Sequence, residues 1–271
     1  MTPIITDNQT GILYRKWPAE KQAECIFLLV HGLGAQSARW EFIAGYLKTR
    51  EISSYAIELK GYGETKDLKG HIDSFDVYYN DIKLLYNIIQ KEQPGKKIFI
   101  LGESMGALLS LLMVIQNPGL FSGVICISPA FVNNMPFSVS MYIKFITSII
   151  FSPKAMIPMP FNSQWITRDV QYQKQLDSDT REIRVASAKT LFNILLAQGK
   201  TKKLLNTINI PVLFLVAGID KLIKGESSRK IFETIANKNK ELVYYPDMYH
   251  ALSIDSGREK VFDDIINWLK K

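Results

Sequence analysis

Residues 97–106 read Lys-Ile-Phe-Ile-Leu-Gly-Glu-Ser-Met-Gly, and a second apolar run, residues 107–115, follows directly. The first run predicts a buried strand, and the second predicts a helix. A Gly-x-Ser-x-Gly sequence between a strand and a helix is typical of a nucleophile elbow. Both glycines are expected for steric reasons, because a side chain there would collide with the neighbouring strand or helix. The stretch therefore predicts that the Ser104 hydroxyl projects into a cleft.

Around this stretch, short apolar runs alternate with longer segments of helical periodicity. This alternation predicts an α/β fold, with a mostly parallel sheet covered by helices on both faces. The expected strands are residues 11–17, 25–30, 54–59, 97–101, 123–128, 212–217 and 241–245. The expected helices are residues 40–49, 75–91, 105–117, 226–237 and 258–270.

The alternation stops between residues 129 and 210, which hold helical patterns and no convincing strand. We expect residues 1–128 and 211–271 to form one core and residues 129–210 to form a lid over it. Residues 135–161 are rich in methionine and phenylalanine and are interrupted by prolines, which favours a mobile apolar flap over a single core helix. The predicted substrate-binding residues of this flap are Met135, Met141, Phe145, Met156 and Met159.

The composition of the chain indicates which partners and which cellular compartment to expect. The 271 residues carry a formal net charge of +7, but the lysines are scattered, which favours solubility or weak attraction to anionic lipid over nucleic-acid binding. Cys25 and Cys126 lie in or beside apolar runs, as expected of unpaired cysteines in a reducing compartment. The first ten residues do not resemble a signal peptide, so the predicted location is cytoplasmic.

A serine nucleophile needs a histidine base and an acid that orients the histidine. His31 and His71 precede Ser104, whereas hydrolases with a nucleophile elbow use the order serine, acid, histidine. His250 is therefore the predicted base. It lies between an expected strand and the last expected helix, at the edge of the sheet where sites form.

Three carboxylates compete for the role of the acid. Asp220 follows the expected strand 212–217 and a glycine turn, Asp247 lies three residues before His250, and Glu226 opens an expected helix. A residue at a strand end is held more rigidly than the other two, so Asp220 is the favoured acid.

Attack on a carbonyl also requires two backbone N–H donors for the oxyanion. Met105 follows the nucleophile at a helix start and supplies one predicted donor. The sequence His31-Gly32-Leu33-Gly34 follows the expected strand 25–30 and is an HGxG turn of the kind that lipases and esterases use. Leu33 is the second predicted donor, and the ring of His31 is expected to brace this loop.

With these motifs in this order, the chain resembles the α/β-hydrolase superfamily. Three further segments are similar to the monoacylglycerol lipase and lysophospholipase group: Ser128-Pro129-Ala130, Ile166-Thr167-Arg168-Asp169, and Asp177 with the expected helix 186–196. The resemblance implies a serine esterase that hydrolyses monoacylglycerols or related monoacyl esters under a lid, with no metal or organic cofactor. It assigns Ser104, Asp220 and His250 to a catalytic triad, with Leu33 and Met105 in the oxyanion hole.

The chain departs from these relatives in one loop, where an Asp-x-x-Gly-His-Gly-x-Ser stretch is common and residues 58–65 read Glu-Leu-Lys-Gly-Tyr-Gly-Glu-Thr. Three alternatives stay open: an esterase for short-chain or phenolic esters, an imino-peptidase, and a non-catalytic ligand receptor. An imino-peptidase would need a lid carboxylate for the substrate amine, and Asp177 and Asp179 are the nearby choices. The expected partners are a small acyl ester and, transiently, a membrane surface, with the oligomeric state open.

Overall fold

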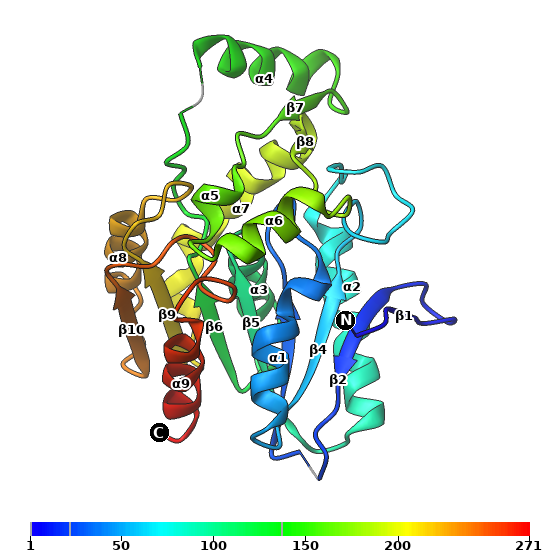
Figure 1. Cartoon of the computed structure of the whole chain (residues 1–271), viewed down its shortest axis with the longest axis vertical. Coiled ribbons are helices and arrows are strands. Elements are labelled where there is room, and N and C mark those ends of the chain that lie inside the picture. Colours follow the sequence, from blue (N-terminus) through cyan, green and yellow to red (C-terminus); the bar gives the residue numbers. More distant parts are fainter. Residues whose placement is uncertain (1, 22, 137) are drawn as a thin grey trace.

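A central sheet of mostly parallel strands organises the molecule (Figure 1). The computed structural model describes residues 2–21, 23–136 and 138–271. Within these ranges, the strand order is β1-β2-β4-β3-β5-β6-β9-β10, with every neighbouring pair from β4 to β10 parallel and β1 and β2 antiparallel. The strands are β1 Ile5–Thr6, β2 Leu13–Trp17, β3 Cys25–Val30, β4 Ser53–Glu58, β5 Lys97–Glu103, β6 Gly123–Ile127, β9 Val212–Ala217 and β10 Lys240–Tyr245. The predicted α/β fold is confirmed.

Helices cover both faces of this sheet because the inner strands are apolar on both sides. In β3, Leu28 belongs to the apolar cluster that includes α2 and α3, whereas Leu29 belongs to the cluster of α1 and α9 on the other face. Successive side chains of a strand point to opposite faces, so one continuous apolar run fills two cores. The covering helices are α1 Glu41–Lys48, α2 Phe75–Glu92, α3 Met105–Gln116, α8 Gly225–Glu233 and α9 Arg258–Leu269.

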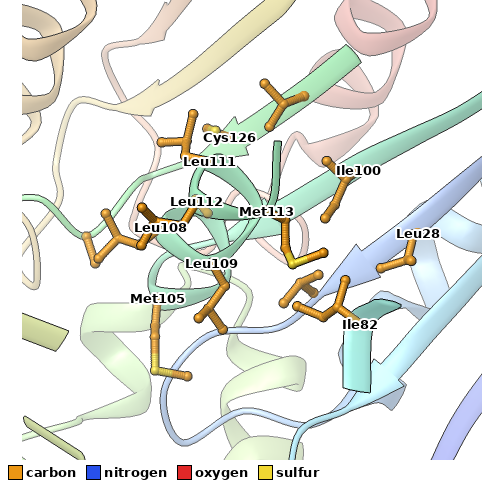
Figure 2. Packing of buried hydrophobic residues seen from close by; sticks show 14 of the residues in the cluster. Leu28, Ile82, Ile100, Met105, Leu108, Leu109, Leu111, Leu112, Met113 and Cys126 are labelled. Carbon is orange, nitrogen blue, oxygen red and sulfur yellow. The ribbon is translucent and has the colours of Figure 1, made fainter. Parts of the chain in front are cut away.

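Helix α3, which begins next to Ser104, is the most deeply buried helix of the core. Every residue from 105 to 114 is buried, as expected of a helix that is apolar on all sides. Its leucines and methionines pack against β3, β5 and α2, as Figure 2 shows for Leu109 and Met113 beside Ile82 and Ile100. The nucleophile elbow therefore leads into a helix that is buried on all sides over its first ten residues.

Residues 129–136 and 138–210, which we call the lid after the sequence prediction, lie at one end of the molecule over the edge where the parallel strands finish (Figure 1). Its elements are α4 Val139–Phe151, β7 Met156–Pro158, α5 Ser163–Ile166, α6 Val170–Ser178, β8 Val185–Ser187 and α7 Ala188–Leu204. Helix α7 packs on both α3 and α4, so it joins the core to the outer part of the lid.

Two expectations for the lid are wrong. Strands β7 and β8 pair in antiparallel register although the sequence predicted no strand there. Each has only three residues, and a segment of that length shows no measurable periodicity. The helix expected over residues 186–196 continues to Leu204, because buried Ala197 and Thr201 extend its packed face through a lysine-rich stretch.

The core elements differ from expectation mainly at their ends. The expected helix 40–49 begins with a 3-10 turn, η1 Ser37–Trp40, where the Gln36 side chain accepts a hydrogen bond from Ala38 N–H. Helix α8 ends at Glu233, four residues earlier than expected, and the short edge strand β1 was not predicted. A second 3-10 turn, η2 Leu205–Thr207, follows α7. Across the described ranges, the helices all fall short of the length and apolarity needed to cross a bilayer.

Candidate active site

Ser104 occupies the sharp turn between β5 and α3 in a strained conformation, with φ 57° and ψ −118°. The flanking glycines are sterically required, as predicted. A Cβ on Gly102 would lie 2.2 Å from the Gly106 carbonyl oxygen, and one on Gly106 would lie 2.0 Å from the Val30 carbonyl oxygen. Strand β5, helix α3 and strand β3 approach one another so closely here that Ser104 is directed into the cavity beneath the lid.

The two other residues of the predicted triad lie in contact. His250 follows β10 on a loop that leads to α9, and its Nδ1 lies 2.7 Å from Oδ2 of Asp220, which follows β9. The other oxygen of Asp220 accepts hydrogen bonds from Leu222 N–H at 2.9 Å and Ile223 N–H at 2.8 Å. Both partners of the pair are buried, so the carboxylate holds the imidazole in one orientation.

The surroundings of His250 make it a stronger base than an exposed histidine. Burial lowers its pKa, but the charge of Asp220, its hydrogen bond and the charge of Glu103 together outweigh burial, and the pKa is raised above 6.5. When Nδ1–H donates to Asp220, the other nitrogen, Nε2, is left as the proton acceptor.

The competing acids both lie at exposed positions. Asp247 is exposed on the turn after β10. Glu226 is exposed in the first turn of α8, where its carboxylate lies 2.8 Å from Lys230 Nζ. Of the three carboxylates that the sequence allowed, Asp220 is therefore the one in hydrogen-bond contact with His250.

His31 has the structural role that the sequence predicted. Its Nδ1 lies 2.9 Å from the Gly32 carbonyl oxygen, and its Nε2 accepts a hydrogen bond from Leu59 N–H at 3.1 Å. Burial lowers the pKa of His31 to about 4, so the ring stays neutral and can accept that bond. The ring thus joins the loop after β3 to the chain after β4.

The predicted oxyanion donors, Leu33 and Met105, line the same cavity as Ser104 and His250. The loop that bears Leu33 lies directly against the nucleophile, since a Cβ on Gly32 would lie 3.1 Å from Ser104 Cβ. Met105 is the first residue of α3, where backbone N–H groups have no acceptor within the helix.

Glu58, the first residue of the loop in which the sequence departs from the expected pattern, contacts the 3-10 turn η1. Its buried carboxylate accepts hydrogen bonds from Ser37 N–H at 3.0 Å and from Ser37 Oγ–H at 2.7 Å. The sequence showed the departure at Glu58 but not this partner, which lies 21 positions away.

The cavity beneath the lid has a volume of about 500 Å³ and mostly apolar walls. Four of the five predicted substrate-binding residues line it: Met135, Met141, Phe145 and Met159. Met156 is not among the lining residues in the described chain. Ile157 and Met159 of the same extended segment do line it, and the alternation of side chains along a strand turns Met156 to the other face.

Polar side chains that sequence reasoning missed also line the cavity. The guanidinium of Arg39, from η1, makes two contacts with the carboxylate of Glu182, from the lid, including Nε to Oε1 at 2.9 Å. Both side chains are largely buried. The charge of Arg39 acts on both His250 and Glu103, so we place the pair at the catalytic end of the cavity. The partners are 143 positions apart, and no local pattern links them.

The part of the chain that the structure describes contains no group of three or more His, Cys, Asp or Glu side chains placed to hold a metal ion. The functional groups that the described residues bring to the cavity include a serine hydroxyl, an imidazole with a carboxylate partner, the Arg39–Glu182 ion pair and the carboxylate of Glu103.

Comparison with known proteins identifies the family. Residues 21–257 match the Hydrolase_4 family, described as serine aminopeptidase, S33. Human monoglyceride lipase is 25% identical over 273 residues, covering 99% of this chain and 89% of the human protein.

Solved structures show the same architecture. The monoacylglycerol lipase of Paleococcus ferrophilus has a TM-score of 0.84 at 24% identity, covering 95% of this chain and 98% of that one. A soluble variant of Saccharomyces cerevisiae monoglyceride lipase, in complex with a substrate analog, has a TM-score of 0.87 at 22% identity, covering 99% and 94%. Because the family match spans most of the sequence, this chain belongs to the Hydrolase_4 family and has the α/β-hydrolase fold.

Proposed function

We propose that the protein is a serine hydrolase that cleaves monoacyl esters, such as monoacylglycerols, through an acyl-enzyme. The observation that carries the proposal is the opening of Ser104 and His250 into one apolar cavity under a lid. Relatives with matching length, the human protein among them, are named monoglyceride lipases.

The reaction would begin with Ser104 Oγ attacking the ester carbonyl while His250 Nε2 takes the hydroxyl proton. The Asp220 carboxylate would stabilise the resulting imidazolium, and Leu33 N–H and Met105 N–H would hold the oxyanion. As the C–O bond of the ester breaks, the alcohol would leave with the proton from His250. Water would then attack the acyl-enzyme by the same steps, releasing the fatty acid and restoring Ser104.

The shape and polarity of the cavity favour a substrate with one acyl chain and a small polar alcohol. The wall formed by α4, β7 and α7 is mostly apolar, and each methylene buried against it contributes roughly 0.8 kcal/mol. Arg39 and Glu182 bring hydrogen-bonding groups to the catalytic end. A monoacyl ester of a polyol matches both regions.

The test is a substrate panel measured on the wild type and on Ser104→Ala. We expect monoacylglycerols to be hydrolysed faster than lysophospholipids, triacylglycerols and short esters, and Ser104→Ala to be inactive. A fluorophosphonate probe should label the wild type and not the variant. An unlabelled wild type would remove the enzyme hypothesis and favour a ligand receptor, and a preference for acetate esters would favour the short-chain esterase.

The imino-peptidase alternative has little support in the lid. The Asp177 carboxylate pairs with Arg184 and accepts a hydrogen bond from Ser163, and Asp179 pairs with Arg181. Neither aspartate is among the cavity-lining residues of the described chain. Glu182 does line the cavity, but Arg39 already neutralises it. Cleavage of proline anilides at a rate comparable to ester hydrolysis would revive this alternative.

Contact with a membrane surface is a further part of the proposal, because monoacyl lipids partition into bilayers. Helix α4 is apolar on two sides: Met141 and Phe145 face the cavity, whereas the opposite side is exposed to solvent. The exposed residues are Val139 75%, Ile143 58%, Ile146 58%, Ile150 67% and Phe151 83%. Exposed Lys144 and Lys154 flank them, which suits a weakly anionic lipid surface.

Sedimentation with vesicles tests this contact. We expect the wild type to bind vesicles that contain anionic lipid, and the double variant Ile143→Ser/Ile150→Ser to bind at least several-fold less. A matched control is Leu68→Ser, which removes an exposed aliphatic side chain far along the chain from α4. Equal binding by the wild type and the double variant would contradict docking through α4.

We also propose a cytoplasmic location, as the composition predicted. Cys25 and Cys126 are both free thiols, which fits a reducing compartment. Cell fractionation with an antibody tests the location, and recovery of the protein from the culture medium would contradict it.

A further inference from the structure

The proposed reaction assigns no role to Glu103, the last residue of β5. It stands directly before Ser104, its side chain is buried, and it lines the catalytic end of the cavity. Its Oε1 accepts a hydrogen bond from Ser253 Oγ–H at 2.9 Å and a longer one from Ser253 N–H at 3.3 Å. Ser253 is fully buried and lies three residues after His250, on the same loop.

The hydrogen bonds between Glu103 and Ser253 connect the nucleophile elbow directly to the His250 loop. Ser104 and His250 come from segments separated by more than a hundred residues, and β5 and the His250 loop are not neighbours in the sheet. On its other side, the loop is held by Ser128, whose Oγ–H donates to the His250 carbonyl oxygen at 2.7 Å. Glu103 and Ser128 thus hold the His250 loop from the ends of two adjacent strands, β5 and β6.

The charge of Glu103 also acts on the imidazole. Burial raises the pKa of Glu103, while His250, Arg39 and the Ser253 hydrogen bonds favour its ionised form. The other ionisable groups around His250 and Glu103 are Asp220 after β9, Arg39 in η1, and Glu182 and Tyr172 of the lid. The guanidinium of Arg39 is engaged by Glu182, which limits how far it neutralises Glu103.

We propose that Glu103 is a positioning residue that sets the His250 loop against the nucleophile elbow and stabilises the imidazolium formed when Ser104 is deprotonated. The inference rests on the proposed function. Glu103 makes and breaks no covalent bond: the Ser104 proton resides on His250 Nε2 until the leaving alcohol takes it. The Asp220 carboxylate orients the ring, and Glu103 supplies a second negative charge from the end of a different strand, β5.

The test separates the charge of Glu103 from its hydrogen bond. Glu103→Gln keeps an oxygen acceptor for Ser253 and removes the charge, whereas Ser253→Ala removes the hydroxyl donor and keeps the charge. Asp81→Asn is the matched control, because Asp81 is a buried carboxylate on α2 that pairs with Lys60 away from the cavity. The readouts are kcat/KM against pH and the rate of fluorophosphonate labelling of Ser104 against pH.

We expect Glu103→Gln to move the acidic limb of both profiles to lower pH by about half to one unit, since a negative charge that raises the His250 pKa is lost. Ser253→Ala should slow labelling several-fold at every pH and leave the limb in place, and Asp81→Asn should change neither. Glu103→Asp retains the charge, so its limb should stay near the wild-type position.

A Glu103→Gln limb at the wild-type pH would overturn the electrostatic role. Unchanged labelling in Ser253→Ala would overturn the positioning role, and this second variant keeps the inference testable if Glu103→Gln does not fold. Labelling also distinguishes two kinds of failure. A wild type that is not labelled refutes the proposed function, whereas a labelled wild type whose variants behave identically refutes only the role of Glu103.

Discussion

At the scale of single residues, the site depends on backbone strain at Ser104 and on buried charge at His250. The serine adopts a positive φ that a non-glycine residue rarely adopts, and the surrounding core maintains it. The histidine is buried, which by itself would favour its neutral form, yet the Asp220 carboxylate lies 2.7 Å from its Nδ1. The pKa of His250 is therefore raised because the nearby carboxylates outweigh the effect of burial.

The pH dependence of hydrolysis follows from that outcome. In the proposed reaction His250 must be neutral to accept the Ser104 proton, and its pKa is raised above 6.5, so kcat/KM should fall as the pH is lowered through a value above 6.5. Asp220→Asn should reduce kcat by about 10⁴-fold, because the amide cannot fix the required tautomer. A pH–rate profile of p-nitrophenyl ester hydrolysis measures both effects. Activity that is constant between pH 5 and 9 would contradict the role of His250.

The elbow glycines allow a stability prediction. Gly106→Ala would place a Cβ 2.0 Å from the Val30 carbonyl oxygen, a backbone atom that cannot move aside without displacing β3. We expect the free energy of unfolding to fall by about 3 kcal/mol or more, the upper end for overpacking. Gly199→Ala is the control, because a Cβ on Gly199 within α7 would meet no atom within 4 Å, and it should stabilise by about 0.5–1 kcal/mol. Urea denaturation of the wild type, Gly106→Ala and Gly199→Ala measures the three free energies of unfolding.

At the scale of elements, two parts of the lid are attached to the core in different ways. The segment between α5 and α6 is bonded to the His250 loop through Asp255, a fully buried carboxylate. Asp255 accepts hydrogen bonds from Arg168 N–H at 2.6 Å, Thr167 Oγ–H at 3.1 Å and Tyr249 N–H at 2.9 Å. Helix α4, in contrast, has its packing partner in α7 and an apolar outer face in solvent. The segment near α5 therefore acts as part of the active-site framework.

Removal of the Asp255 charge should affect stability and activity together. Asp255→Asn leaves Arg168 without its ion-pair partner, and we expect the free energy of unfolding to fall by about 3 kcal/mol. We also expect kcat to fall, because the His250 loop loses its support. KM should change little, because the substitution leaves the apolar walls of the cavity intact. Thermal unfolding and ester hydrolysis measure the two effects, with Asp247→Asn, an exposed position on the same loop, as the control. Full wild-type activity in a destabilised Asp255→Asn would show that this segment does not position the loop.

At the scale of the whole molecule, the core supplies the reactive groups and the lid supplies most of the apolar wall. The cavity of about 500 Å³ lies between them, with Ser104 and His250 on the core side and Met141 and Phe145 on the lid side. Neither part encloses an acyl chain alone. In the proposed function, the core would therefore determine the type of reaction, and the lid would determine the substrate preference.

Chain-length preference tests this division. We expect kcat/KM for p-nitrophenyl esters to rise with acyl length until the cavity is filled. Phe145→Ala should reduce the value for long chains about tenfold or more and leave the acetate ester nearly unchanged, because only a long chain contacts the lid. Ile146→Ala, on the outer face of the same helix, is the matched control. Equal losses for short and long esters would contradict an acyl-binding role for α4.

Much of the core and the order of the reactive residues were accessible to sequence analysis because their signals are local. Strands such as Val212–Ala217 are continuous apolar runs, and the elbow is a five-residue pattern. His250 followed from chain order, and Asp220 followed from its place at a strand end. The lid was harder, because β7 and β8 are too short for a periodic signal and the direction of Met156 depends on their pairing.

By itself, the sequence determined the α/β class, the elbow at Ser104 and the choice of His250 and Asp220, since periodicity and chain order express backbone geometry directly. The tertiary structure alone decided which distant side chains meet: Glu103 with Ser253, 150 positions apart, and Arg39 with Glu182, 143 apart. Such pairs form because parallel strands end at one edge and the lid folds over it, and no local spacing encodes the contact. Burial then determines how strongly these charges act on His250, because the low dielectric of the interior strengthens them.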